Sequence, residues 1–220
     1  RDDVESRGLG DVYKRQAKDR EGITGIKYIS FMNIRVAHEK KGCAEKILPF
    51  LKDGESIYNT LLVSKPGAGK TTCLRDCIRS LSNGKEGWEG MKICVVDERS
   101  EIAACHLGIP QNDMGIRTDV LSGCGKSEGM MLMLRSMSPQ IIAVDELGGK
   151  KDFQAVEQAA CSGVRILGTV HADTVEELWE KPYLKKWMKR GIFERFILIR
   201  HNRSGERDFQ VFNGKREQLC

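Results

Sequence analysis

The segment from Ser64 to Thr71 constrains the fold of this 220-residue chain more than any other feature. It reads Ser-Lys-Pro-Gly-Ala-Gly-Lys-Thr and fits the phosphate-loop pattern G-x-x-x-x-G-K-[ST], with serine in place of the first glycine. The apolar run Asn59–Ser64 predicts a buried strand before the loop, and residues from Gly69 to about Leu81 predict a helix after it. Because main-chain N–H groups and the positive end of the helix dipole then point at one place, this order predicts a phosphate site.

Each residue type in the loop has a distinct expected role toward a bound nucleotide. Gly67 and Gly69 allow the positive φ angles that turn successive N–H groups inward. Lys70 is expected to reach the β- and γ-phosphates, and the Thr71 hydroxyl to bind Mg²⁺. We therefore predict ATP and Mg²⁺ as the bound species; a chance glycine turn is the alternative. The predicted nucleotide-binding residues are Lys65, Pro66, Gly67, Ala68, Gly69, Lys70, Thr71 and Thr72.

Two acids, Asp145 and Glu146, end a second apolar strand that is predicted over Gln140–Asp145. Burying adjacent carboxylates at the end of a strand is costly without a cation. A Mg²⁺ ion held by Thr71 and, through water, by Asp145 would supply that cation and leave Glu146 to orient an attacking water. The alternative is that the acids cap the following helix.

Further polar residues end neighbouring strands. His171 follows the predicted strand Val164–Val170, where it could sense the γ-phosphate as a third catalytic residue beside Lys70 and Glu146, or else cap the next helix. Asp97, Glu98 and Glu101 end the predicted strand Met91–Asp97, beside the site or as solvated loop charges.

Four arginines are candidates for completing the site of a neighbouring subunit. An arginine supplied across an interface can accelerate phosphoryl transfer by about 10³–10⁵. Sequence does not rank them, and a surface or packing role is the alternative for each. They are Arg35, Arg99, Arg117 and Arg135.

Apolar strands that alternate with helices predict an α/β fold, with a mainly parallel sheet covered by helices on both faces. Besides the segments above, the pattern predicts strands within Gly25–Val36 and over Phe193–Ile199 and Asp208–Phe212, helices over Cys43–Leu51, Ser127–Met137, Asp152–Ser162 and Pro182–Arg190, and a capping box from Thr174 to Glu177. The predicted divisions are a non-native or disordered segment (1–16), the remnant of an N-terminal domain with its linker (17–53), a P-loop ATPase domain (54–200) and a C-terminal hairpin or tail (201–220).

Composition limits the partners. The net charge is +5, and no run approaches the roughly 18 uncharged apolar residues of a membrane span. Eight cysteines without a Cys-x-x-Cys pair indicate reduced thiols in a cytosolic protein rather than a metal site. The basic segment Lys185–Arg216 is either simply solvated or faces anionic lipid or nucleic acid.

Taken together, these motifs resemble the stage III sporulation protein AA family, ring-forming ATPases of endospore formers that are related to type II and type IV secretion ATPases. The resemblance covers about Ile26 to Arg200 and adds the stretches Asn33–Ala37, Val95–Ile102, Gly115–Val120, Glu128–Met131, Arg135–Pro139, Val144–Gly148 and Thr169–His171.

This resemblance implies a RecA-like domain that hydrolyses ATP and forms a ring of about six copies. It also implies membrane-protein partners in a channel between mother cell and forespore, and a cytoplasmic location on the mother-cell side. A nucleic-acid partner is not expected, since basic segments of this kind are usually solvated. Residues Asp97–Glu101 would be the acidic box and His171 part of the histidine box. The sequence departs from the family in lacking most of the N-terminal domain, in His38 where a second arginine is expected, and in Gly149 where an arginine commonly follows.

Three other functions fit parts of the sequence. Leu121–Gly125 mimics the signature loop of an ABC-type nucleotide-binding domain, but it follows Lys70 too soon to leave room for that family's helical subdomain. A small-molecule kinase would need an arginine-rich lid and an acceptor pocket. An ATP-binding module without turnover would keep the loop and lose the chemistry.

Overall fold

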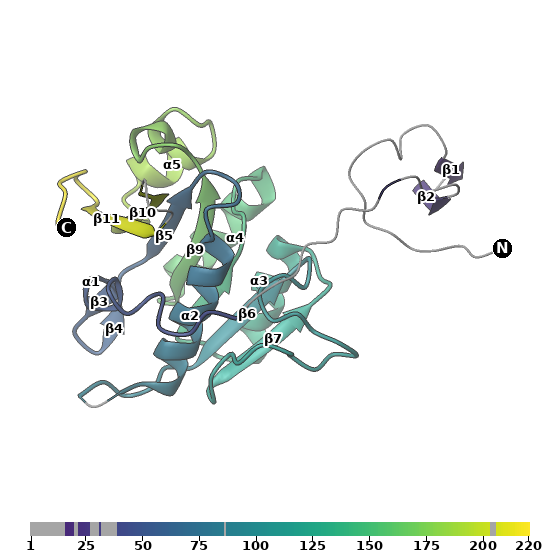
Figure 1. Ribbon diagram of the computed structural model, residues 1–220, viewed down its shortest axis with the longest axis horizontal. Coiled ribbons are helices and arrows are strands. Elements are labelled where there is room, and N and C mark those ends of the chain that lie inside the picture. The colour runs from purple at the N-terminus through teal and green to yellow at the C-terminus, as the bar shows by residue number, and fades with distance from the viewer. Residues whose placement is uncertain (1–15, 20–21, 27–30, 32–38, 86, 203–205) are drawn as a thin grey trace. The chain divides into compact units, whose positions relative to one another are not determined.

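The computed structural model describes residues 16–19, 22–26, 31, 39–85, 87–202 and 206–220 (Figure 1). It divides into two units, residues 1–38 and 39–220. In the first unit, β1 (Gln16–Asp19) and β2 (Gly22–Ile26) form an antiparallel hairpin. The strands predicted within Gly25–Val36 overlap the end of β2 and otherwise fall almost wholly outside the described residues, as do Arg35 and most of the segment 1–16.

A seven-stranded sheet forms the centre of the second unit (Figure 1). Its order is β11-β10-β5-β9-β8-β6-β7, and every neighbouring pair is parallel except β10 with β11. The strands are β5 (Thr60–Ser64), β6 (Ile93–Asp97), β7 (Thr118–Ser122), β8 (Ile141–Val144), β9 (Arg165–His171), β10 (Arg195–His201) and β11 (Arg207–Asn213). The predicted α/β fold with a mainly parallel sheet is confirmed.

Helices cover both faces of this sheet. Successive strand residues point to opposite faces, so Leu61 and Val63 pack on one side and Leu62 on the other. The first side also holds the apolar residues of α3, α4 and α5, and the second those of α1 and α2. The helices are α1 (Leu48–Leu51), α2 (Lys70–Asn83), α3 (Lys126–Ser136), α4 (Lys150–Cys161) and α5 (Leu184–Lys189), with the 3₁₀ helix η2 (Glu176–Trp179) and the two-residue strands β3 (Lys52–Asp53) and β4 (Ser56–Ile57).

Several local predictions were wrong. The strand β7 was not predicted, because its five residues are all only half-buried and its sequence, Thr-Asp-Val-Leu-Ser, is that of an edge strand. The Leu121–Gly125 stretch, which mimics the signature loop of an ABC-type domain, therefore begins inside strand β7. The helix α3 begins one residue earlier than predicted, with Gly125 rather than Ser127 at the N-cap.

Two other segments also differ from the prediction. Most of Cys43–Leu51 consists of turns that end in the single helical turn α1. The capping box does not form, because the Glu177 carboxylate accepts a hydrogen bond from the N–H of Asp173 (3.1 Å) rather than pairing with Thr174. In contrast, Gly163 ends α4 in the left-handed region as predicted (φ +80°).

The chain's eight cysteines are free thiols, of which Cys73, Cys77 and Cys94 are buried. Among the described residues, no helix is both long and apolar enough to cross a membrane.

Candidate functional site

The loop between β5 and α2 has the backbone geometry of an anion-binding loop. Gly67 and Gly69 both adopt positive φ (+78° and +89°), a region that residues with a Cβ rarely enter. Gly69 is the N-cap of the 14-residue helix α2, which begins at Lys70. The free N–H groups of the first helical turn therefore stand at the end of β5, where the sequence predicts the phosphates.

Ser64, which replaces the first glycine of the loop pattern, is buried and holds the loop lysine. Its carbonyl oxygen and its hydroxyl oxygen both accept hydrogen bonds from the Nζ of Lys70, each at 3.3 Å. The carbonyl of Lys65 accepts a third, also at 3.3 Å. The serine thus supplies an acceptor that glycine could not.

Lys70 also contacts His171, which lies opposite Ser64 on the neighbouring strand β9. The Lys70 Nζ lies 2.9 Å from Nδ1 of the imidazole ring. Because an ammonium group only donates, Nδ1 accepts, and the ring proton is assigned to Nε2. Burial lowers the pKa of Lys70, which is only 5% exposed, and the charges of Asp145 and Glu146 oppose that shift.

Asp145 lies directly after β8 and connects the loop to the next two strands. Its Oδ2 accepts a hydrogen bond from the Thr71 hydroxyl at 2.7 Å, and its Oδ1 accepts one from the Thr169 hydroxyl of β9. Mg²⁺ prefers oxygen ligands, such as those of hydroxyl and carboxylate groups. The pair Thr71 and Asp145 is therefore compatible with the predicted Mg²⁺ site, in which Asp145 acts through water.

Glu146 adopts a positive φ (+53°) that is uncommon for a residue with a side chain. Its N–H donates to the Thr169 hydroxyl at 2.9 Å, which helps to hold this conformation. The carboxylate then accepts a hydrogen bond from Nε2 of His171 (3.0 Å) and pairs with Nη1 of Arg99 (2.9 Å). The hydrogen bond from His171, together with the charge of Arg99, lowers the pKa of Glu146, so the carboxylate is ionised at neutral pH.

The acidic residues at and after the end of β6 have different roles. Asp97 is 2% exposed, and its carboxylate accepts hydrogen bonds from the N–H groups of Glu101 (2.9 Å), Ile102 (3.1 Å) and Ala103 (2.8 Å). Glu98 instead pairs with Lys126 (3.6 Å). The Asp97 carboxylate thus organises the loop after β6, and only Glu98 belongs to the network around Glu146.

We predict that Asp97→Ala lowers the free energy of unfolding by about 3 kcal/mol, because three N–H groups, of which those of Ile102 and Ala103 are buried, lose their acceptor. Glu98→Ala, which removes a half-exposed pair, should change it by less than about 0.5 kcal/mol. Urea denaturation of both variants measures the difference. Equal stability of Asp97→Ala and the unchanged chain would show that the carboxylate has no structural role.

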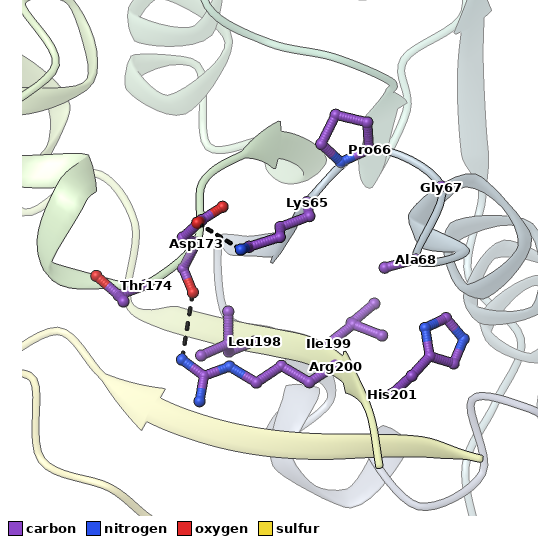
Figure 2. Close-up of a pocket in the computed structure, with 10 residues that line it drawn as sticks. All are labelled: Lys65, Pro66, Gly67, Ala68, Asp173, Thr174, Leu198, Ile199, Arg200 and His201. Carbon is purple, nitrogen blue, oxygen red and sulfur yellow. Dashed lines mark hydrogen bonds and ion pairs between the residues drawn. The ribbon is translucent and has the colours of Figure 1, made fainter. Parts of the chain in front are cut away.

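A cavity of about 660 Å³ lies beside the phosphate loop (Figure 2). Pro66, Gly67 and Ala68 line one side of it, and the end of β10 lines the other. Figure 2 shows that the loop after β9 bridges the two sides, since Asp173 pairs with Lys65 Nζ at 2.7 Å and its carbonyl accepts from Arg200 at 3.2 Å.

The remaining arginine candidates lie away from this cluster. Arg117 pairs with Glu89 (3.5 Å) just before β7, at the opposite edge of the sheet. Arg135 is exposed in the last turn of α3. Of the candidates in the described part of the chain, only Arg99 joins the site within one subunit.

Several residues of the site were missed from sequence. Lys126 donates to the Glu146 carbonyl at 2.7 Å, and Lys181 donates to the His171 carbonyl. Thr169 contacts both acids. Arg75, a buried residue of α2, donates to the carbonyls of Glu101 and Ile102 (2.8 and 2.6 Å). Of these, only Thr169 carried a signal, because it stands two residues before His171 on one strand.

Comparison with known proteins places this arrangement in a family. The family model described as "Sporulation stage III, protein AA" matches residues 10–219. The chain belongs to this family. Stage III sporulation protein AA of Bacillus subtilis (strain 168) is 42% identical over 183 residues, which make up 83% of this chain and 59% of that protein. The chain therefore spans less than two thirds of this relative.

Solved structures share the fold. The match to the Legionella pneumophila ATPase DotB covers 80% of this chain and 51% of the DotB chain, with a TM-score of 0.59 and 16% sequence identity. The match to the pilus retraction motor PilT with bound ADP covers 88% of this chain and 56% of the PilT chain, with a TM-score of 0.57 and 16% sequence identity. The sporulation family member thus has the P-loop ATPase fold of these proteins.

Proposed function

We propose that this chain binds Mg-ATP in residues 65–72 and hydrolyses it. The observation that carries this proposal is one hydrogen-bonded cluster of Lys70, Asp145, Glu146 and His171, brought together from α2, the end of β8 and the end of β9. Carboxyl ends of parallel strands are where such folds place ligands.

The proposed reaction is the in-line attack of water on the γ-phosphate. Glu146, ionised at neutral pH, holds the water and takes up its proton as the water oxygen bonds to the γ-phosphorus, while the bond from the γ-phosphorus to the bridging oxygen breaks and ADP leaves. Lys70 neutralises charge on the β- and γ-oxygens. Thr71 and Asp145 would hold Mg²⁺, which would supply further neutralisation of the phosphate charge.

His171 is proposed to report loss of the γ-phosphate. In the structure, its Nδ1 accepts from Lys70 and its Nε2 donates to Glu146. When Lys70 turns to the phosphates, Nδ1 loses its donor, so the ring becomes free to follow the γ-phosphate. This would couple the state of the nucleotide to the loop after β9, where the Lys181 side chain binds the His171 carbonyl.

In the cell, we propose a ring of about six copies that energises a channel complex between mother cell and forespore. Family membership and the fold of secretion ATPases support this role. The proposed partners are the membrane proteins of that complex, which would recruit the chain to the cytoplasmic, mother-cell side of the membrane.

Steady-state release of phosphate from Mg-ATP tests the proposal. We expect turnover that needs Mg²⁺ and no added phosphate acceptor, and size-exclusion chromatography should show a larger assembly with a non-hydrolysable ATP analogue. Nucleotide binding without release would instead identify a binding module. Turnover only with an added acceptor would identify a kinase.

A further inference from the structure

Arg207, the first residue of β11, reaches the phosphate loop from a part of the chain that no loop motif includes. Because β11 runs antiparallel to β10, Arg207 lies opposite His201, at the carboxyl end of the parallel strands. This is the edge of the sheet at which β5 enters the loop. A residue 138 positions after Gly69 is thereby brought to the start of α2.

The guanidinium of Arg207 lies directly against Gly69. A Cβ added at Gly69 would stand 2.5 Å from Nη2 and 2.9 Å from both Cζ and Nε of the arginine. The absence of a side chain at Gly69 is therefore what lets the guanidinium approach the loop backbone. A positive group at this place is unexpected, since the N-terminus of α2 is itself electropositive.

Among the described residues, one nitrogen of this guanidinium has no hydrogen-bond partner. Arg207 Nη1 is shielded from solvent and has no hydrogen-bond acceptor within the described residues. A buried donor of a charged group without an acceptor is costly. Two positive features, the guanidinium and the helix N-terminus, thus converge on one place, and the ligand that would relieve both is an anion.

The direction of approach indicates which part of the anion Arg207 meets. Strand β5 lies between β9 on one side and β10 on the other. Lys70 points to His171 of β9, and Thr71 to Asp145 at the end of β8, so the γ-phosphate end belongs on that side. Arg207 approaches from the side of β10 and β11, where the α-phosphate end of the nucleotide would then lie.

We propose that Arg207 is a nucleotide-binding residue whose guanidinium donates hydrogen bonds to the α-phosphate. This inference rests on the proposed function, because it takes residues 65–72 as the nucleotide site. ATP and ADP share the α-phosphate, so loss of the guanidinium should weaken both to the same extent. A hydrogen bond to a charged group of this kind corresponds to a factor of about 10 to 100 in affinity.

Isothermal titration calorimetry of the full 220-residue chain with Mg-ATP and with Mg-ADP tests the proposal. Arg207→Gln is expected to raise both dissociation constants about 10- to 100-fold, and Arg207→Lys, which keeps the charge but not the fork, by less. Lys215→Gln is the matched control, since it removes a positive charge beyond the other end of β11 and should change neither constant by more than about twofold.

Thermal unfolding without nucleotide separates binding from folding. Since Nη1 has no acceptor among the described residues, Arg207→Gln should melt within about 2 °C of the unchanged chain. If Arg207→Gln does not melt cooperatively, Arg207→Lys alone decides, and wild-type affinity for both nucleotides in that variant overturns the proposal. Equal affinities of Arg207→Gln and the unchanged chain overturn it too, as does weakening of ATP alone. Absence of binding by the unchanged chain overturns the proposed function itself.

Discussion

Lys70→Ala is expected to weaken Mg-ATP binding at least about 100-fold and to abolish phosphate release. The ammonium group would make charge-assisted hydrogen bonds to two phosphates, each stronger than a bond between neutral groups. Its burial lowers its pKa, and a bound polyphosphate would favour the charged form again. No other side chain of the loop can replace it, because Lys65 is turned toward Asp173.

The measurement is calorimetry with Mg-ATP, combined with a phosphate-release assay. Lys65→Ala is the matched control: it keeps the main chain, through which Lys65 belongs to the proposed site, and removes only a 68% exposed side chain paired with Asp173, so affinity should change by less than about threefold. Lys70→Ala also leaves acceptors of Ser64 and Lys65 without a donor, so urea denaturation must accompany the titration. A folded Lys70→Ala chain that binds Mg-ATP normally would contradict the site.

Sequence predicted the centre of the site because its residues follow directly from buried strands. Asp145, Glu146 and His171 each stand at the end of an apolar run, and the ends of parallel strands meet at one edge of the sheet. Their position at the ends of predicted strands was therefore enough to place them on the same edge of the sheet as Lys70. The same reasoning assigned Asp97 to this edge correctly. It could not show that the Asp97 carboxylate accepts hydrogen bonds from three backbone N–H groups.

What sequence could not predict depends on side chains that cross between elements. Lys126 reaches Glu146 from the first residue of α3, and Arg207 reaches Gly69 from the far end of the chain. Neither belongs to a short motif, and each is one basic residue among the 36 of the chain. Strand β7 was missed for a related reason, since an edge strand that is half-buried throughout lacks the apolar run by which the other strands were found.

Glu146→Gln is expected to lower the rate of phosphate release at least about 100-fold while ATP binding stays within about threefold. The amide keeps the shape of the side chain, and its oxygen can still accept the hydrogen bond from His171. It carries no negative charge, so it holds a water for attack less strongly and cannot take up a proton. The Arg99 guanidinium would lose its ion pair, which at this half-exposed position has little effect on stability.

The rate and the affinity must be measured on one preparation, because only their divergence identifies the role of Glu146. Glu89→Gln is the matched control: it neutralises an exposed acid that pairs with Arg117 away from the site, and its release rate should stay within about twofold. Because the hydrogen bond from His171 and the charge of Arg99 hold the pKa of Glu146 low, the ionisation of this carboxylate should not change the wild-type rate between neutral pH and about pH 6. A Glu146→Gln chain with the wild-type rate would assign the positioning of water to another residue, whereas parallel loss of rate and affinity would mean that the carboxylate serves nucleotide binding instead.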